Sequence, residues 1–386
     1  MKTKLLLAGF ALFLAWTCST HAVATENPKE VTKSFTVSKG GIVELETEGG
    51  DIKVSTWDKS EVFVRAEGIE ERDLHRLKMT QSGNTIVIRY RSGGGWFSRG
   101  RDVHFSLTLP TQFDLDAQTS GGDIVVRGPL SGTLKGSTSG GDVKLGDLGG
   151  TITMTTSGGD ITGDKLNGDS YLKTSGGDIR VSSVGGDAEI NTSGGDISVD
   201  YVKKDLRAKT SGGDINIGEV GGAVAASTAG GDIKIRKSAG NVTASTAGGD
   251  IRMGSASGTV KAKTAGGDIR LERINGSVEA KTAGGEVEAE LVPSGKGRSR
   301  LATAGGDVRL FIPESACATI EARIRVHGWW GADMQRYNIK SDYKAETFER
   351  SKDDEEIHGT YILNGGGESI SLETVNSDIE IRKARK

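Results

Sequence analysis

Acidic residues recur at a fixed spacing through most of the chain, each after a pair of glycines in the string T-(S/A)-G-G-D-(I/V). The spacing is 19 residues at the first step, 18 at each of the next eight and 21 at the last. A column of carboxylates could bind divalent cations, chiefly Ca²⁺, which prefers oxygen ligands. The column consists of Asp123, Asp142, Asp160, Asp178, Asp196, Asp214, Asp232, Asp250, Asp268, Glu286 and Asp307, and its members from Asp142 to Asp268 are the candidate calcium ligands.

The same column has an explanation without a metal. Ca²⁺ takes about six to eight oxygen ligands, and one Asp in each unit supplies too few. The pattern also departs from the calcium-binding nonapeptide repeat G-G-x-G-x-D-x-U-x, because the third glycine is missing and the opposite corner often lacks an acid, as at Gly221-Gly222-Ala223. We therefore expect each carboxylate to cap its own corner by accepting backbone N–H bonds, with no cofactor, and keep calcium binding as the alternative.

A column of threonines precedes the glycine pairs. Its parity along the alternating residues matches that of apolar positions such as Ala188 and Ile190, so we expect these hydroxyls to point inward and to form a ladder at the corner. The alternative is an ice-binding or ligand-array role. The column consists of Thr138, Thr156, Thr174, Thr192, Thr210, Thr228, Thr246, Thr264, Thr282 and Thr303.

Residues suited to catalysis do not gather in the sequence. An active site on a repeat fold needs a local departure from the repeat where unlike residues converge, and the units from Asp123 to Asp268 contain none. The histidines of the flanks do not have metal-ligand spacing, and no Ser/His/Asp or Cys/His arrangement can be argued. We expect no enzyme, and a polysaccharide-acting enzyme is the alternative.

One glycine-rich loop, residues 91–101, combines aromatic and basic side chains. Its Trp96, Phe97, Arg99 and Arg101 could contact an anionic envelope surface, or the loop could fold its aromatics over the end of the repeats. Within the repeats, aromatic residues are nearly absent. The repeats therefore lack the stacking platform that is typical of sugar recognition.

The elements that position these columns are short strands. In residues 178–195, two runs of alternating apolar and polar residues each end in a Gly-Gly pair, and alternation of period two predicts strands with one buried face. Such units must stack to bury that face, with equivalent strands parallel and about 4.8 Å apart. The sequence therefore predicts an all-β fold, a parallel β-solenoid (β-helix) with 18-residue coils, flanked by irregular β-rich capping regions. Gly-Gly suits a corner that needs positive φ or close backbone approach.

The chain divides into four predicted segments: a signal peptide at 1–24, an N-terminal β-rich cap at 25–118, the GGD-repeat solenoid at 119–310, and a C-terminal cap with a degenerate final coil at 311–386. We expect a helical turn within residues 70–78 and a hairpin around Ser82-Gly83-Asn84. No later segment is apolar and long enough to span a membrane. The formal net charge of −3 is mild and argues against nucleic acid as a partner.

The repeats, the segment LTLP at residues 107–110 and the closing TVNSDIEIRK resemble a bacterial family of GGD(I/V) β-strand repeat domains named putative adhesins. The resemblance implies a solenoid at the cell envelope and provides no catalytic or cofactor residues. We expect an exported, non-enzymatic protein in the periplasm or at the cell surface. It would have an adhesin-like or scaffold role toward a protein or glycan ligand of the envelope or surface.

Overall fold

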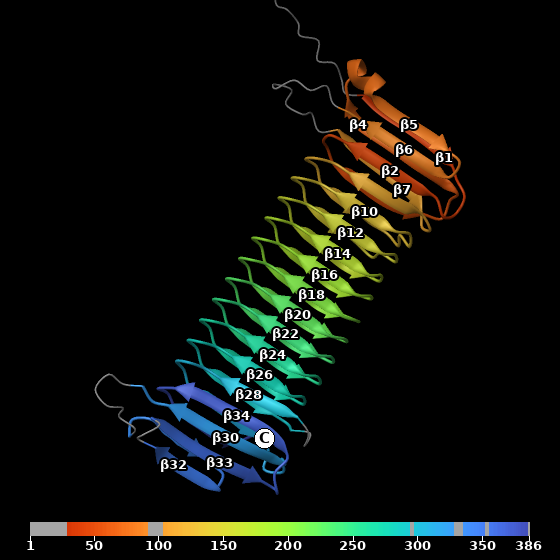
Figure 1. Cartoon of the computed structure of the whole chain (residues 1–386). Helices are drawn as coiled ribbons and strands as arrows, with labels where there is room; N and C mark the ends of the chain where they lie inside the picture. Colours follow the sequence, from red (N-terminus) through yellow and green to blue (C-terminus); the bar gives the residue numbers. More distant parts are fainter. Residues whose placement is uncertain (1–28, 92–102, 294–296, 328–334, 352–354, 385–386) are drawn as a thin grey trace, which may run out of the picture.

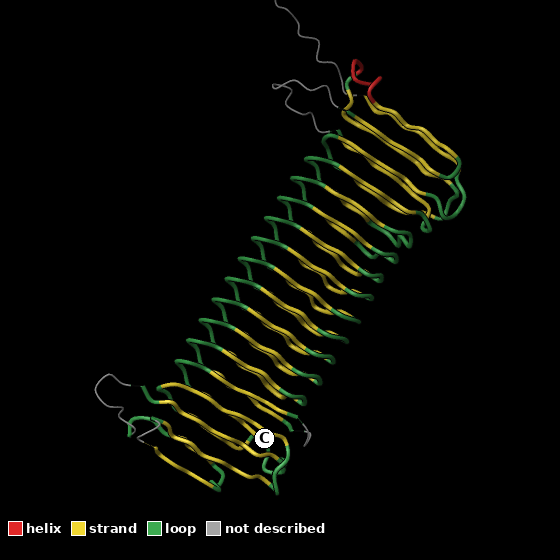
Figure 2. The backbone as a smooth tube through the Cα atoms, in the orientation of Figure 1, coloured by secondary structure: helices red, strands yellow, loops and turns green. Residues whose placement is uncertain are grey.

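The protein is a rod made of two long β-sheets that face each other (Figure 1). The computed structural model describes residues 29–91, 103–293, 297–327, 335–351 and 355–384. Short turns join the sheets at both edges of the rod, so the chain coils from one sheet to the other (Figure 2). The predicted all-β parallel solenoid is confirmed.

The two sheets are here called sheet A and sheet B. In spatial order, sheet A contains β1 (Lys29–Thr36), β4 (Glu61–Ile69), β7 (His104–Pro110), β3 (Ile52–Trp57), β9 (Ile124–Val126), β11 (Val143–Leu145), β13 (Ile161–Leu166), β15 (Ile179–Val184), β17 (Ile197–Val202), β19 (Ile215–Val220), β21 (Ile233–Ser238), β23 (Ile251–Ala256), β25 (Ile269–Ile274), β27 (Val287–Leu291), β29 (Val308–Ile312), β35 (Ile379–Lys383) and β31 (Ile339–Ser341). Sheet B contains β5 (Leu77–Ser82), β6 (Thr85–Tyr90), β2 (Ile42–Thr47), β8 (Asp114–Gln118), β10 (Leu134–Ser137), β12 (Ile152–Thr155), β14 (Ser170–Lys173), β16 (Ala188–Asn191), β18 (Leu206–Lys209), β20 (Val224–Ser227), β22 (Val242–Ser245), β24 (Val260–Lys263), β26 (Val278–Lys281), β28 (Arg298–Ala302), β34 (Glu368–Val375), β30 (Ala318–Arg325), β33 (Glu356–Leu363) and β32 (Thr347–Ser351).

Each repeat contributes one coil, and from β13 to β26 the strand in sheet A has 6 residues and the strand in sheet B has 4. In β15 and β16, the inward residues Ile179, Val181, Val184, Ala188 and Ile190 are buried, as the alternation predicts. The same positions of neighbouring coils lie opposite each other, for example Val181 beside Val199. The core is therefore a set of apolar rows that run along the rod.

The second glycine of each Thr-x-Gly-Gly-Asp corner is required for close approach between coils. A Cβ added to Gly195 would lie 2.1 Å from the carbonyl oxygen of Gly177, whereas one added to Gly194 would come no closer than 3.3 Å to a neighbouring atom. Gly195 does not have a positive φ. Of the two reasons that the sequence allowed for Gly-Gly, the structure supports close approach at this position.

The order of the coils in space differs from their order in the sequence at both ends. The coil of β2 and β3 lies between the coil of β6 and β7 and the coil of β8 and β9. The coil of β34 and β35 likewise lies between the coil of β28 and β29 and the coil of β30 and β31. Each terminal region thus inserts one coil between two others.

Antiparallel elements complete the two ends. At the N-terminal end, the 3₁₀ helix η1 (Glu71–Arg76) precedes the antiparallel hairpin of β5 and β6, so the predicted helical turn and hairpin are confirmed. At the other end, β32 and β33 pair antiparallel beyond β30. Antiparallel pairing thus ends both sheets at the N-terminal end and sheet B at the C-terminal end, whereas sheet A ends there in the short parallel strand β31.

Candidate functional site

The acid column forms a ladder between coils. The backbone N–H of Asp214 donates to Oδ1 of Asp196 at 2.8 Å, and the backbone N–H of Asp232 donates to Oδ1 of Asp214 at the same distance. The same bond links the other neighbouring acids from Asp123 to Glu286. The expectation that each carboxylate caps its own corner is wrong. The carboxylate caps the corner of the next coil, because stacking brings that N–H within reach.

Basic side chains two residues after the acids pair with some of the carboxylates. Arg180 contacts Asp178 at 2.6 Å and Asp160 at 3.9 Å, and Arg252 and Lys144 bridge the two acids beside them in the same way. Asp196 and Asp214 have Ser198 and Asn216 at the corresponding positions instead. Repulsion in that stretch is therefore offset mainly by the backbone N–H bonds.

Among the residues that the structure describes, no group of three or more His, Cys, Asp or Glu side chains is placed to hold a metal ion. One oxygen of each acid from Asp123 to Asp268 already accepts a backbone N–H. Calcium binding by the acids from Asp142 to Asp268 stays a prediction.

The threonine column lies inward at the same corners, as predicted. Thr192 is buried, with 6% of its surface exposed, and its Oγ1 donates to the carbonyl oxygen of Gly177 at 2.8 Å and accepts the N–H of Gly195 at 3.4 Å. The hydroxyls therefore do not bond to one another. Each one instead joins two coils through a glycine carbonyl.

The predicted surface-binding residues Trp96, Phe97, Arg99 and Arg101 lie outside the described residues. Of the histidines, His104 lies beside Asp51, with its Nδ1 3.3 Å from Oδ2 of that carboxylate. Within the part of the chain that the structure describes, no helix is long and apolar enough to cross a membrane.

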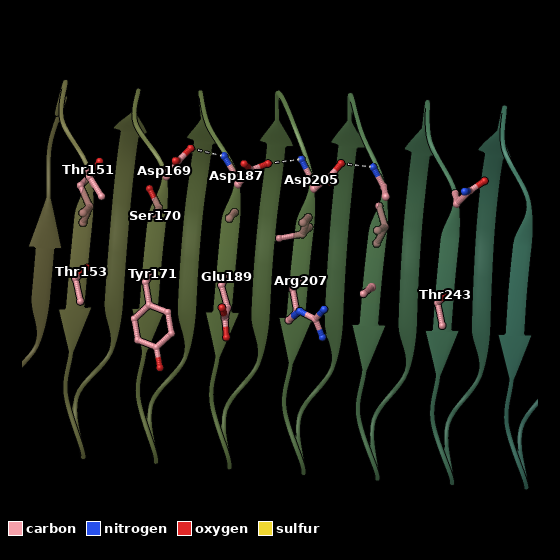
Figure 3. A pocket seen from close by; sticks show the side chains of 17 residues that line it. Thr151, Thr153, Asp169, Ser170, Tyr171, Asp187, Glu189, Asp205, Arg207 and Thr243 are labelled. Carbon is pink, nitrogen blue, oxygen red and sulfur yellow. Dashed lines mark hydrogen bonds between the residues drawn. The ribbon is translucent and has the colours of Figure 1, made fainter.

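An open groove of about 520 Å³ lies on the outer face of sheet B. It crosses β12, β14, β16, β18, β20 and β22, so its long axis follows the rod (Figure 3). Its floor is the sheet itself at Ser170, Ala188, Leu206 and Val224, whose side chains point to the core. We call this concavity the sheet B groove.

One wall of the sheet B groove contains carboxylates at the turns that enter β14, β16 and β18. Oδ1 of Asp169 accepts the N–H of Asp187 at 2.9 Å, Oδ1 of Asp187 accepts the N–H of Asp205, and Oδ1 of Asp205 accepts the N–H of Ala223 (Figure 3). Lys204 lies 3.7 Å from both Asp169 and Asp187. These three acids form a second, shorter ladder of the same hydrogen bonds, at the edge of the rod opposite the Thr-x-Gly-Gly-Asp corners.

The other wall consists of outward side chains in direct register across neighbouring strands. Tyr171 lies opposite Glu189, Glu189 opposite Arg207, and Arg207 opposite Ala225. Thr243 continues the row beyond Ala225. The face of the Tyr171 ring is turned toward the open side of the groove (Figure 3). The row therefore combines one aromatic surface with an acid, a base and two small side chains.

This surface was not predicted from the sequence. The rarity of aromatic residues in the repeats predicted that a stacking platform is lacking, whereas the structure places Tyr171 at the edge of the sheet B groove. The signal was present in the period, because residues 18 apart at this outward position read Thr153, Tyr171, Glu189, Arg207, Ala225 and Thr243. Residues at one outward position of successive repeats form a continuous surface, so this row could be predicted from the period.

A family model described as Toastrack DUF4097 matches residues 42–237 and 200–326. Comparison with curated proteins gives no match. The chain is similar to solved structures named putative adhesins from Parabacteroides merdae (12% identity, 68% of this chain and 96% of that chain, TM-score 0.36) and Bacteroides fragilis (15%, 68% and 97%, TM-score 0.25). It is also similar to a structure named as a putative lipid binding protein from Parabacteroides distasonis (13%, 70% and 95%, TM-score 0.28). These TM-scores are low, so the family assignment rests on the sequence match.

Proposed function

Since this chain belongs to the Toastrack DUF4097 family, we propose that it is an exported, adhesin-like or envelope scaffold protein that binds a ligand and does not transform it. The observation that carries this proposal is the sheet B groove. It is long, shallow and open to solvent along the rod, which suits an extended ligand. An active site normally encloses its substrate and brings unlike polar groups together at one point.

The surroundings of the groove support binding rather than catalysis. Its acids Asp169, Asp187 and Asp205 are evenly spaced along the rod, and each already accepts a backbone N–H. Evenly spaced groups offer equivalent contacts to successive units of a ligand. They do not form the pair of unlike acid and base that hydrolysis of a polysaccharide needs.

Export is the second part of the proposal. Residues 1–24 have the basic start, apolar stretch and small-residue cleavage site of a signal peptide. We further propose that the Gly-Gly-Asp corner is the repeat that members of this family share, because its hydrogen bonds join every pair of neighbouring coils in the central rod.

Cell fractionation tests export. We expect the protein outside the cytoplasm, in the periplasm or at the surface, with Thr25 as its first residue. Full-length protein that stays in the cytoplasm would refute the proposed function.

A binding experiment tests the surface. The purified mature protein is incubated with envelope fragments and with intact cells, alongside two variants. Ala225→Trp fills the sheet B groove, and Asn216→Trp places the same side chain on the outer face of sheet A. Both positions face outward on strands, where an aromatic residue is well tolerated. We expect binding that Ala225→Trp abolishes and Asn216→Trp retains. Equal binding by both variants would exclude the groove, and no binding to either material would refute the role.

A further inference from the structure

We propose that the sheet B groove binds a neutral linear glycan, which lies along the rod axis with one sugar ring stacked on Tyr171. This inference rests on the proposed binding function and adds the class of ligand. It is carried by the period of the groove, the chemistry of its walls and its charge.

The period of the groove suits a polymer of sugar units. The backbone of the groove repeats from strand to strand at about 4.8 Å, and along one wall Asp169, Asp187 and Asp205 follow that spacing. A pyranose unit in an extended chain advances by a similar length, so successive sugars would meet equivalent positions of successive coils. A groove that crosses the strands from β12 to β22 provides room for several such units.

The two walls offer the contacts that sugars use. The Tyr171 ring presents its face to the open side, and an aromatic face packs against the C–H groups of a pyranose (Figure 3). Across the groove, Asp169, Asp187 and Asp205 each use Oδ1 for a backbone N–H. The second carboxylate oxygen has acceptor capacity for sugar hydroxyls, and the exposed Arg207 adds donors.

The charge of the walls disfavours an anionic ligand. Four carboxylates line the groove, from Asp169, Asp187, Asp205 and Glu189, against the single guanidinium of Arg207. Lys204 neutralises part of this charge from beside Asp169 and Asp187. A polyanion such as a uronate polymer would bring like charges to within a few ångströms of this wall and would be repelled.

A peptide is disfavoured by the backbone of the groove. Extended peptides commonly bind by adding a strand to a free sheet edge, where main-chain N–H and C=O groups are unpaired. The sheet B groove lies on a sheet face, and each strand that it crosses pairs with a neighbour on both sides. Recognition must therefore use side chains, which favours a ligand rich in hydroxyl groups.

Calorimetric titration of the full mature protein tests the inference. The probes are the neutral hexasaccharides cellohexaose, chitohexaose and laminarihexaose, with an oligogalacturonate of the same length as the anionic probe. We expect at least one neutral probe to bind and the anionic probe not to bind. Tyr171→Ala should weaken the binding by at least about tenfold, whereas Tyr171→Phe, which keeps the ring, should change it less than about twofold.

Tyr201 provides a matched control, because it is an exposed tyrosine on the outer face of sheet A. Tyr201→Ala should leave binding unchanged. Failure of all three neutral probes, preference for the anionic probe, or equal losses in Tyr171→Ala and Tyr201→Ala would each overturn the glycan assignment. Envelope binding that Ala225→Trp abolishes but that survives complete glycosidase digestion of the envelope sugars would also overturn it, while retaining the proposed binding function.

Discussion

Oδ1 of Asp51 accepts the backbone N–H of Asp123 at 3.0 Å, although 72 residues separate them in the chain. The bond is the same as the one that joins acids 18 residues apart in the central coils. Thr119 repeats the second link of the corner, because its Oγ1 donates to the carbonyl oxygen of Gly50 at 2.9 Å. Asp51 follows its own glycine pair in Gly49-Gly50-Asp51-Ile52, outside the regular column, and is therefore the first rung of the ladder.

The C-terminal end has the same arrangement. The backbone N–H of Asp378 donates to Oδ1 of Asp307 at 3.0 Å across 71 residues, and Thr374 donates to the carbonyl oxygen of Gly306 at 2.7 Å. The corner geometry thus depends on stacking and not on chain connectivity. At each end, the inserted coil pairs with the coils on both of its sides, and these pairings attach the terminal region to the rod.

Substitution of the second corner glycine should destabilise the rod. In Gly195→Ala the new Cβ would meet the carbonyl oxygen of Gly177 at 2.1 Å, so two coils must separate, and we expect a loss of about 1–3 kcal/mol or more in the free energy of unfolding. Gly194→Ala is the matched control, because its Cβ would lie 3.3 Å from the carbonyl oxygen of Gly176, a contact that a shift of a few tenths of an ångström relieves. Denaturant unfolding measures both. Equal losses would show that close approach is not the reason for the glycine.

Removal of a corner hydroxyl should also cost stability. Thr192→Val keeps the shape but leaves the carbonyl oxygen of Gly177 and the N–H of Gly195 without this partner, at a cost of about 1–3 kcal/mol. Thr243→Val makes the same change on the exposed outer face and should have little effect. If thermal unfolding shows similar losses for both variants, the buried hydroxyl bonds contribute nothing specific.

The acid column should stabilise the rod without calcium. In the triple variant Asp196→Asn, Asp214→Asn and Asp232→Asn, each amide oxygen can still accept the N–H of the next coil. Neutral side chains also remove repulsion of about 1 kcal/mol per neighbouring pair at the dielectric constant of water. We expect this variant to be at least as stable as the wild type. Asp214→Ala, which loses the acceptor, should be less stable by about 1 kcal/mol.

Thermal unfolding with and without Ca²⁺ tests whether the acids bind calcium. Thermal unfolding of the wild type should give the same midpoint in EDTA and in millimolar Ca²⁺. A rise in the midpoint with Ca²⁺ that the triple Asn variant does not show would make the acids ligands, because a single site at a hundredfold excess over its Kd adds about 2.7 kcal/mol.

One whole coil should be removable. Deletion of residues 250–267 joins Gly249 to Asp268. Every remaining strand stays in its own sheet, and every remaining acid stays in the ladder. We expect a folded, monomeric protein with a slightly lower free energy of unfolding, since a solenoid is stabilised by contacts between neighbours. Deletion of residues 250–258 removes half a coil and would force a sheet B strand into sheet A, so it should aggregate. Circular dichroism and solution mass distinguish the two, and folding of both would show that the phase is unimportant.

The C-terminal end should lose stability in acid. The pKa of the Asp342 carboxyl is lowered by the backbone N–H of Lys383 and by the Arg382 guanidinium, which donate to it at 3.1 and 3.0 Å. These bonds stabilise the fold above the unfolded pKa of about 3.9 and are lost as the pH falls through the lower folded value. Unfolding from pH 5 to pH 2 should show a smaller acid-induced loss for Asp342→Asn than for the wild type. If the free energy of unfolding falls by the same amount in both proteins, the assignment to Asp342 is wrong.

Much of the rod could be predicted from the sequence, because its interactions repeat within one period. Alternation assigned the buried faces of β15 and β16, and the parity of Thr192 placed its hydroxyl inward. The Gly-Gly pairs located the corners. The sequence could not decide between positive φ and close approach for Gly195, because the atom that it approaches belongs to another coil.

The sequence by itself determined the period, the two sheets and the inward and outward sides, since these depend on residues a few positions apart. Only the tertiary structure decided that the coil of β2 and β3 stacks on β8 and β9, although β4 to β7 intervene in the chain, and that each acid caps its neighbour's corner. It also decided that Tyr171, Glu189 and Arg207 share one groove. Those relationships join different coils, and stacking in space rather than distance along the chain sets which groups meet.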